Sequence, residues 1–179
     1  MSGFDLDKEE WEMFRAMRRK RQQLSRAEAE AILERGTSGV LAVAGDDGYP
    51  YTVPLSYVYQ DGKLWFHGAK SGHKLDAVRR EEKASFCVID QDQVVPEEYT
   101  TYFRSAIAFG RVRVLEDEGE VRAAIDLLAR RYHPGDSQEH RQAAIQKEYS
   151  ALCMLELTVE HLTGKEAIEL VRARDRAEP

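Results

Sequence analysis

The chain has 179 residues, 42% hydrophobic and 32% charged, which is enough to bury one sizeable core as a single domain. Its 26 Lys and Arg residues against 32 Asp and Glu residues give a net charge of −6, which argues against a general nucleic-acid-binding surface. No run of about 18 uncharged apolar residues occurs, and the acidic N-terminus carries no apolar signal segment. We therefore expect a cytoplasmic single domain over residues 1–179 that binds neither membranes nor nucleic acid.

A helical extension is predicted at the start of the domain, over about residues 7–35. Apolar residues recur there at helical spacing up to the basic run 18–21, which we expect to be a solvated helix face. A second helix follows: Ser25 and Glu28 have the spacing of a capping box, and Gly36 follows the last periodic residue.

The apolar period then changes from 3.6 to 2, which indicates strands. Three strands in meander order are predicted, at 39–45, 49–59 and 64–68. Asp61 and Gly62, between the last two, are a strong hairpin signal. Pro54 cannot donate to a ladder, so we expect it at a sheet edge, at a bulge, or where another group approaches the backbone.

Further helices and strands follow along the chain. We predict helices at 71–80, 117–132 and 137–149, and strands at 84–90, 102–116 and 151–159. The expected fold is mainly β with flanking helices (α+β). Its six antiparallel strands are expected to form a small closed barrel, which would remove the sheet edges.

The helix start near residue 71 carries an unusual charge pattern. His73 and Lys74 crowd its first turn and no acid precedes Asp76, which is the wrong sign for the positive end of a helix dipole. A phosphate would make this arrangement favourable, because the Ser71 hydroxyl at the expected N-cap, the free amides after Gly72 and the Lys74 ammonium would converge on it. The alternative is an ordinary serine-capped helix with solvated basic side chains, and the charge pattern alone favours the phosphate only slightly.

Two longer motifs carry a resemblance to a known family. They are G-Y-P-Y-x-x-P-L-x-Y at 48–57 and F-H-G-A-x-x-G-H-K-L-D at 66–76, followed in the same order by 102–105, 109–111 and 162–165. Over about residues 17–165 the chain resembles the nitroimidazole-resistance (5-nitroimidazole reductase-like) branch of the pyridoxamine 5′-phosphate oxidase-like, FMN-binding split-barrel proteins.

This resemblance implies that the anion is the phosphate of FMN. It places residues 71–74 near the phosphate, 67–69 beside the flavin and the backbone of 54–56 along the isoalloxazine edge. The basic run 18–21 then has an alternative to a solvated face, because Arg18 or Arg19 could reach the flavin phosphate. The resemblance also implies a homodimer with flavins at the subunit interface, in which residues 104–105 complete the partner's site. The implied cofactor-binding residues are Pro54, Leu55, Ser56, His67, Gly68, Ala69, Ser71, Gly72, His73, Lys74, Arg104 and Ser105.

His67 is the candidate catalytic residue. A histidine at a strand end is more often a packed core residue, but the surrounding motif favours a role for His67 in the functional site. It could donate a proton, hold a ligand or shape the pocket. No metal site is predicted, because the other histidines lack ligands at suitable spacing. Cys87 and Cys153 lie in apolar strand-like runs and are expected to be buried thiols.

Two functions of different classes remain open. The first is an FMN-dependent oxidoreductase that passes electrons from reduced nicotinamide to a small acceptor such as a nitroaromatic. The second is a non-catalytic FMN-binding carrier or sensor. Oxidation of pyridoxamine phosphate is less well supported, because the matching motifs are those of the other branch.

Overall fold

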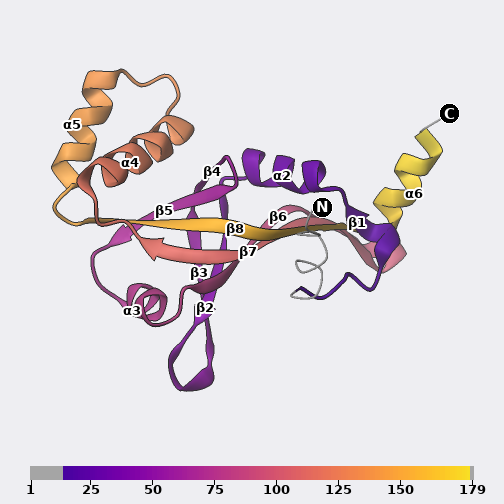
Figure 1. The fold of residues 1–179 in the computed structure, drawn as a ribbon. Helices are drawn as coiled ribbons and strands as arrows, with labels where there is room; N and C mark the ends of the chain where they lie inside the picture. Colours follow the sequence, from indigo (N-terminus) through magenta and orange to yellow (C-terminus); the bar gives the residue numbers. More distant parts are fainter. Residues whose placement is uncertain (1–13, 178–179) are drawn as a thin grey trace, which may run out of the picture.

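The computed structural model describes residues 14–177, which form one antiparallel sheet with flanking helices (Figure 1). The elements are η1 (Lys20–Gln22), β1 (Gln23–Leu24), α2 (Arg26–Arg35), β2 (Ser38–Ala44), η2 (Asp46–Gly48), β3 (Pro50–Ser56), β4 (Val58–Gln60), β5 (Lys63–Ala69), α3 (His73–Arg80), β6 (Lys83–Val95), η3 (Pro96–Glu98), β7 (Thr100–Val114), α4 (Glu118–Tyr132), α5 (Gln138–Glu148), β8 (Leu152–Glu166) and α6 (Ile168–Ala177). Within this described part, no helix has both the length and the apolar character needed to span a membrane.

Over residues 14–177 the sheet has eight strands and is not closed. Its order is β3-β2-β6-β7-β8-β5-β4, with β1 paired to β8, so β3 and β4 are edges. The prediction of a closed six-stranded barrel is wrong in both respects, although the fold class is confirmed. β3 still comes within 8 Å of β5 between Cα atoms, so the sheet curls into a split barrel whose opening lies between these two strands.

The break between β3 and β4 explains part of the difference between the six predicted strands and the eight observed. The predicted strand 49–59 is interrupted at Tyr57, whose side chain is fully buried and donates its hydroxyl to the Leu33 carbonyl at 2.7 Å. Its backbone N–H donates to Tyr132 Oη at 3.0 Å instead of to a strand. One predicted strand therefore becomes two.

Helix α2 covers one side of the main core. The predicted capping box is confirmed, because Ser25 Oγ accepts from the Glu28 amide and the Glu28 carboxylate accepts from the Ser25 amide. Ile32 and Leu33 on this helix are fully buried, and Gly36 follows its last residue.

The predicted helix over about 7–21 differs from the structure. Residues 7–13 lie outside the described part, and from Phe14 the chain is non-helical until the single turn η1. The basic run 18–21 is exposed there. Gln22 is buried and donates to the Glu166 carbonyl at 3.0 Å, so η1 is held by the end of β8. Helix α6, which follows β8, was not predicted from the sequence.

The remaining helices lie at the two ends of the long strands. α4 and α5 pack at one end of β7 and β8, and α6 lies at the other (Figure 1). A second small core forms under α4, where Val121 packs with Met154 and Trp65. The split, α3 and the β2–β3 turn are thus left uncovered by these helices.

Candidate functional site

Helix α3 begins without a side-chain cap. Its N-cap is Gly72, not Ser71 as predicted, and the Gly72 carbonyl accepts from the Leu75 and Asp76 amides at 2.9 and 3.2 Å. Gly72 has φ +123°, a backbone conformation that residues with a side chain rarely adopt, and a Cβ there would meet no atom within 4 Å. The Leu75 and Asp76 amides are thus bonded within the helix, and Gly72 leaves open space beside the helix start, which an anion needs in order to approach the first amides.

Lys74 places an ammonium beside this helix start. Its side chain is half-buried and lies across β5, so that a Cβ added to Gly68 would fall 2.6 Å from Lys74 Nζ. A larger residue at position 68 would push the ammonium away. Gly68, Gly72 and Lys74 thus lie close together, and their chemistry fits a phosphate. Their role in binding a cofactor stays a prediction.

His73 is engaged by neighbours from other elements. Its ring lies 4.0 Å, centroid to centroid, from that of Tyr51 on β3, and its Nε2 lies 3.4 Å from Asp46 Oδ2 in η2. Arg80 donates to Asp46 Oδ1 at 2.9 Å. An acid therefore does face the basic helix start, although it comes from a distant turn. In the sequence, residues 46–48 lie only between two predicted strands and Tyr51 lies within one of them, and no site role was predicted for either.

The predicted flavin-edge residues flank the split. Pro54 lies on the edge strand β3, as expected for a residue that cannot donate. Pro54 and Ser56 are exposed, whereas Leu55 is half-buried against the core. Because β3 approaches β5 without pairing to it, residues 54–56 and 67–69 lie on the two strands that border this opening.

His67 lies on the opposite face of β5 from Gly68, since successive strand residues alternate. It is exposed, shares its face with Trp65, and pairs in register with Met154 of β8. Its side chain and Lys74 therefore occupy different sides of the strand. The catalytic role of His67 stays a prediction.

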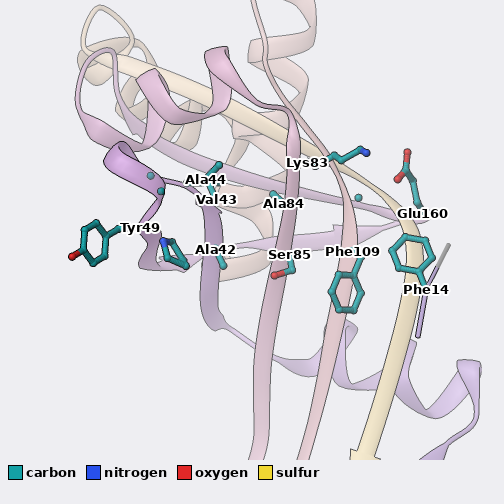
Figure 2. Close-up of a pocket in the computed structure, with 14 residues that line it drawn as sticks. Phe14, Ala42, Val43, Ala44, Tyr49, Lys83, Ala84, Ser85, Phe109 and Glu160 are labelled. Atoms are coloured by element: carbon teal, nitrogen blue, oxygen red, sulfur yellow. The ribbon is translucent and has the colours of Figure 1, made fainter. Parts of the chain in front are cut away.

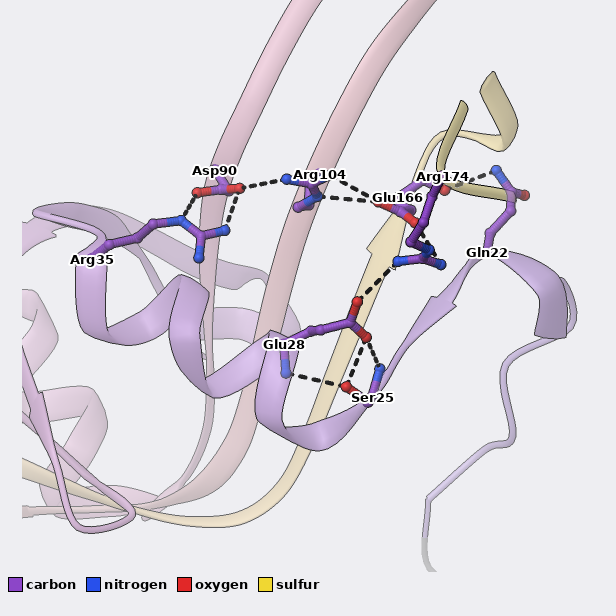
Figure 3. Close-up of polar contacts among 8 residues, drawn as sticks. All are labelled: Gln22, Ser25, Glu28, Arg35, Asp90, Arg104, Glu166 and Arg174. Atoms are coloured by element: carbon purple, nitrogen blue, oxygen red, sulfur yellow. Dashed lines mark hydrogen bonds and ion pairs between the residues drawn. The ribbon is translucent and has the colours of Figure 1, made fainter. Parts of the chain in front are cut away.

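Arg104 belongs to a chain of ion pairs (Figure 3). It donates to Glu166, which is 1% exposed, at 3.0 and 3.2 Å, and lies 3.7 Å from Asp90. Hydrogen bonding from Arg35 holds the pKa of Asp90 below its ordinary value. The other Glu166 oxygen contacts Arg174 at 3.0 Å.

Neither Arg104 nor Ser105 reaches the α3 site within one chain. The β5–β8 and β7–β8 registers place Phe66, the residue before His67, level with Val114, because both pair with Leu155. Val114 lies ten positions along β7 from Arg104, about 33 Å at ~3.3 Å per residue. Ser105 lies on the opposite face of β7 from Arg104. Their contribution to a partner's site stays a prediction.

The outer face of the sheet carries a cavity of about 600 Å³ (Figure 2). Small residues on β2, β6 and β7 leave this space open, among them Ala42, Ser85 and Gly110. Tyr49 and Phe109 stand at its sides (Figure 2). This cavity is not evident from the sequence, because only the strand register brings these residues together.

Two expectations concern cysteines and metals. Cys153 is buried as expected, whereas Cys87 is only half-buried. Desolvation by burial raises the pKa of both thiols above the ordinary value. Within residues 14–177, no three His, Cys, Asp or Glu side chains gather in a way that could hold a metal ion.

The sequence and the fold of this chain are similar to those of known proteins. The sequence profile of the pyridoxamine 5′-phosphate oxidase family matches residues 25–166. No curated protein matches the sequence. A solved candidate 5-nitroimidazole antibiotic resistance protein from Bacteroides thetaiotaomicron is 22% identical, with a TM-score of 0.66 over 80% of this chain and 86% of that one.

Two further solved structures are similar. The FAD-binding protein from Mesorhizobium loti is 23% identical, with a TM-score of 0.60 over 82% of this chain and 97% of that one. The FAD and heme binding protein from Mycobacterium smegmatis is 25% identical, with a TM-score of 0.67 over 85% of this chain and 80% of that one. The family match covers most of the chain, and the fold agrees with it. The chain therefore belongs to the pyridoxamine 5′-phosphate oxidase-like family of flavin-binding split barrels.

Proposed function

We propose that this protein is an FMN-dependent oxidoreductase that passes electrons from a reduced nicotinamide to a small acceptor such as a nitroaromatic. The observation that carries the proposal is the meeting of the uncapped start of α3, Gly68 and Lys74 at the edge of the split barrel. A phosphate at this point would accept from the first α3 amides and from the Lys74 ammonium. The similar proteins from Bacteroides and Mesorhizobium support the acceptor class and the flavin, respectively.

The residues of the split would orient the ring. The backbone of 54–56 and residues 67–69 border the opening, so a planar ring inserted there would meet β3 on one side and the end of β5 on the other. Flavin supplies two-electron transfer, whereas the protein supplies position and electrostatics. His67 is exposed at the end of β5, and we assign it the contact with the acceptor.

The protein is also proposed to be a homodimer that pairs through the outer face of the sheet. The strand register aligns Pro54, Val40, Cys87 and Ile107 in one row across β3, β2, β6 and β7. Val40 is 38% exposed, and Ile89, next along this face, is 64% exposed. A contiguous apolar face of this kind is characteristic of an interface, and it continues directly into the predicted ring edge at Pro54.

Absorbance spectroscopy and titration test the proposal. The purified protein is titrated with FMN, FAD and riboflavin, and the flavin-loaded protein is then mixed anaerobically with NADH or NADPH. Preference for FMN over riboflavin, followed by bleaching of the flavin absorbance, is the expected result. A flavin that stays oxidised with both donors would favour the carrier or sensor, tighter binding of FAD would change the cofactor, and failure to bind any flavin would reject the proposal.

A further inference from the structure

The carboxylate of Asp46 connects the two ends of helix α3. Its Oδ2 lies 3.4 Å from His73 Nε2, at the first residue of the helix, and its Oδ1 accepts from Arg80 Nη1 at 2.9 Å, at the last residue. Arg80 also donates to the carbonyls of Ala44 and Gly45 at 2.9 and 2.8 Å. The β2–β3 turn therefore holds α3 at both ends.

The same contact fixes the direction of the His73 side chain. The ring lies between Tyr51, 4.0 Å away between centroids, and the Asp46 carboxylate. While it does so, its Nε2 is directed at Asp46, and the anion-binding groups left at the helix start are the backbone amides and the Lys74 ammonium.

An acid beside a phosphate site has a cost. The negative charge of Asp46 repels a phosphate at the start of α3, and because its side chain is 64% exposed its ion pairs add little to stability. A benefit to ligand binding must then come from geometry. We infer that Asp46 is a positioning residue, which fixes the first turn of α3 against the β2–β3 turn and keeps His73 off the phosphate. This inference rests on the proposed function.

A matched pair of variants separates geometry from charge. Asp46→Asn removes the carboxylate charge from both contacts, and Asp47→Asn makes the same charge change at the next residue of the turn. Asp47 has φ 51°, a conformation that asparagine tolerates well, so this control is not strained. Dissociation constants for FMN and riboflavin are measured by calorimetry for each variant.

We expect Asp46→Asn to weaken FMN binding about threefold or more and to leave riboflavin binding unchanged, so the preference for FMN falls. Asp47→Asn should leave FMN affinity unchanged or raise it slightly, because it removes only a repelling charge. Asp46→Glu, which keeps the carboxylate, should recover most of the loss. Equal or tighter FMN binding by Asp46→Asn would overturn the inference and leave Asp46 as a repelling charge only.

Hydrogen exchange gives a readout that needs no ligand. In the flavin-free protein, the amides at the start of α3 should exchange faster in Asp46→Asn than in Asp47→Asn. Unchanged exchange would contradict the positioning role. If the unmodified protein binds FMN and riboflavin equally, the proposed function fails and the inference fails with it. If the unmodified protein prefers FMN and Asp46→Asn retains the full preference, the inference alone fails.

Discussion

Replacing Lys74 with methionine tests the phosphate site directly. The change removes the ammonium and keeps most of the apolar stem that lies across Gly68, where Nζ approaches the position of a Cβ to 2.6 Å. Lys74 is half-buried, so its contact with a phosphate would be less weakened by water than a fully exposed one. A hydrogen bond to a charged group contributes about 1.5–3 kcal/mol, and ~1.4 kcal/mol corresponds to a factor of ten. FMN should therefore bind at least about tenfold more weakly.

The control is Lys70→Met, which makes the same charge change in the exposed segment before α3. Calorimetric titration of both variants with FMN and riboflavin is the assay, after circular dichroism has shown that they are folded. Lys74→Met should lose FMN affinity and keep riboflavin affinity, whereas Lys70→Met should change neither by much. An equal loss in both variants, or an equal loss for both ligands, would refute the assignment of Lys74.

His67 provides the complementary test. His67→Ala should retain most of the FMN affinity and alter the rate or the identity of acceptor reduction, because its side chain lies on the other face of β5 from Lys74. If His67→Ala loses the flavin and Lys74→Met keeps it, the two roles are reversed.

Three other measurements address backbone strain, assembly and acid stability. Gly72→Ala should lower the free energy of unfolding by roughly 1–3 kcal/mol in urea titrations because of its φ of +123°, whereas Gly135→Ala, which also has open space but no such φ, should be close to neutral. Ile89→Asp places a charge on a side chain that is 64% exposed on the outer face, and light scattering of the FMN-loaded protein should show a monomer where the unmodified protein is a dimer; a retained dimer would place the interface elsewhere. Arg35 lowers the pKa of Asp90 below its ordinary 3.8, so the stability from this pair is present above that pH and is lost as the pH falls through the lowered value. Asp90→Asn should be less stable at neutral pH and lose less on acidification, in urea midpoints measured from about pH 7 to 2.

Local sequence signals predicted the elements whose contacts are local. The capping box of Ser25 starts α2, and Asp61 and Gly62 take the positive φ values, 50° and 75°, that a two-residue hairpin requires. The break at Tyr57 could not be predicted in this way, because it depends on hydrogen bonds to residues 24 and 75 positions away. The helix α6 and the short strand β1 are likewise stabilised by contacts with the end of β8.

The charge pattern at α3 shows the same limit within the site. His73 and Lys74 were identified from the sequence because they are neighbours, and the absence of a nearby acid indicated an external anion. Asp46 supplies an internal anion to His73 from 27 positions earlier, so the charge of His73 no longer indicates an external anion. Lys74 and the first amides of α3 remain as the groups that indicate one. The phosphate hypothesis therefore no longer depends on the number of positive charges near the helix start. It depends on the position of one half-buried ammonium beside the first backbone amides of α3.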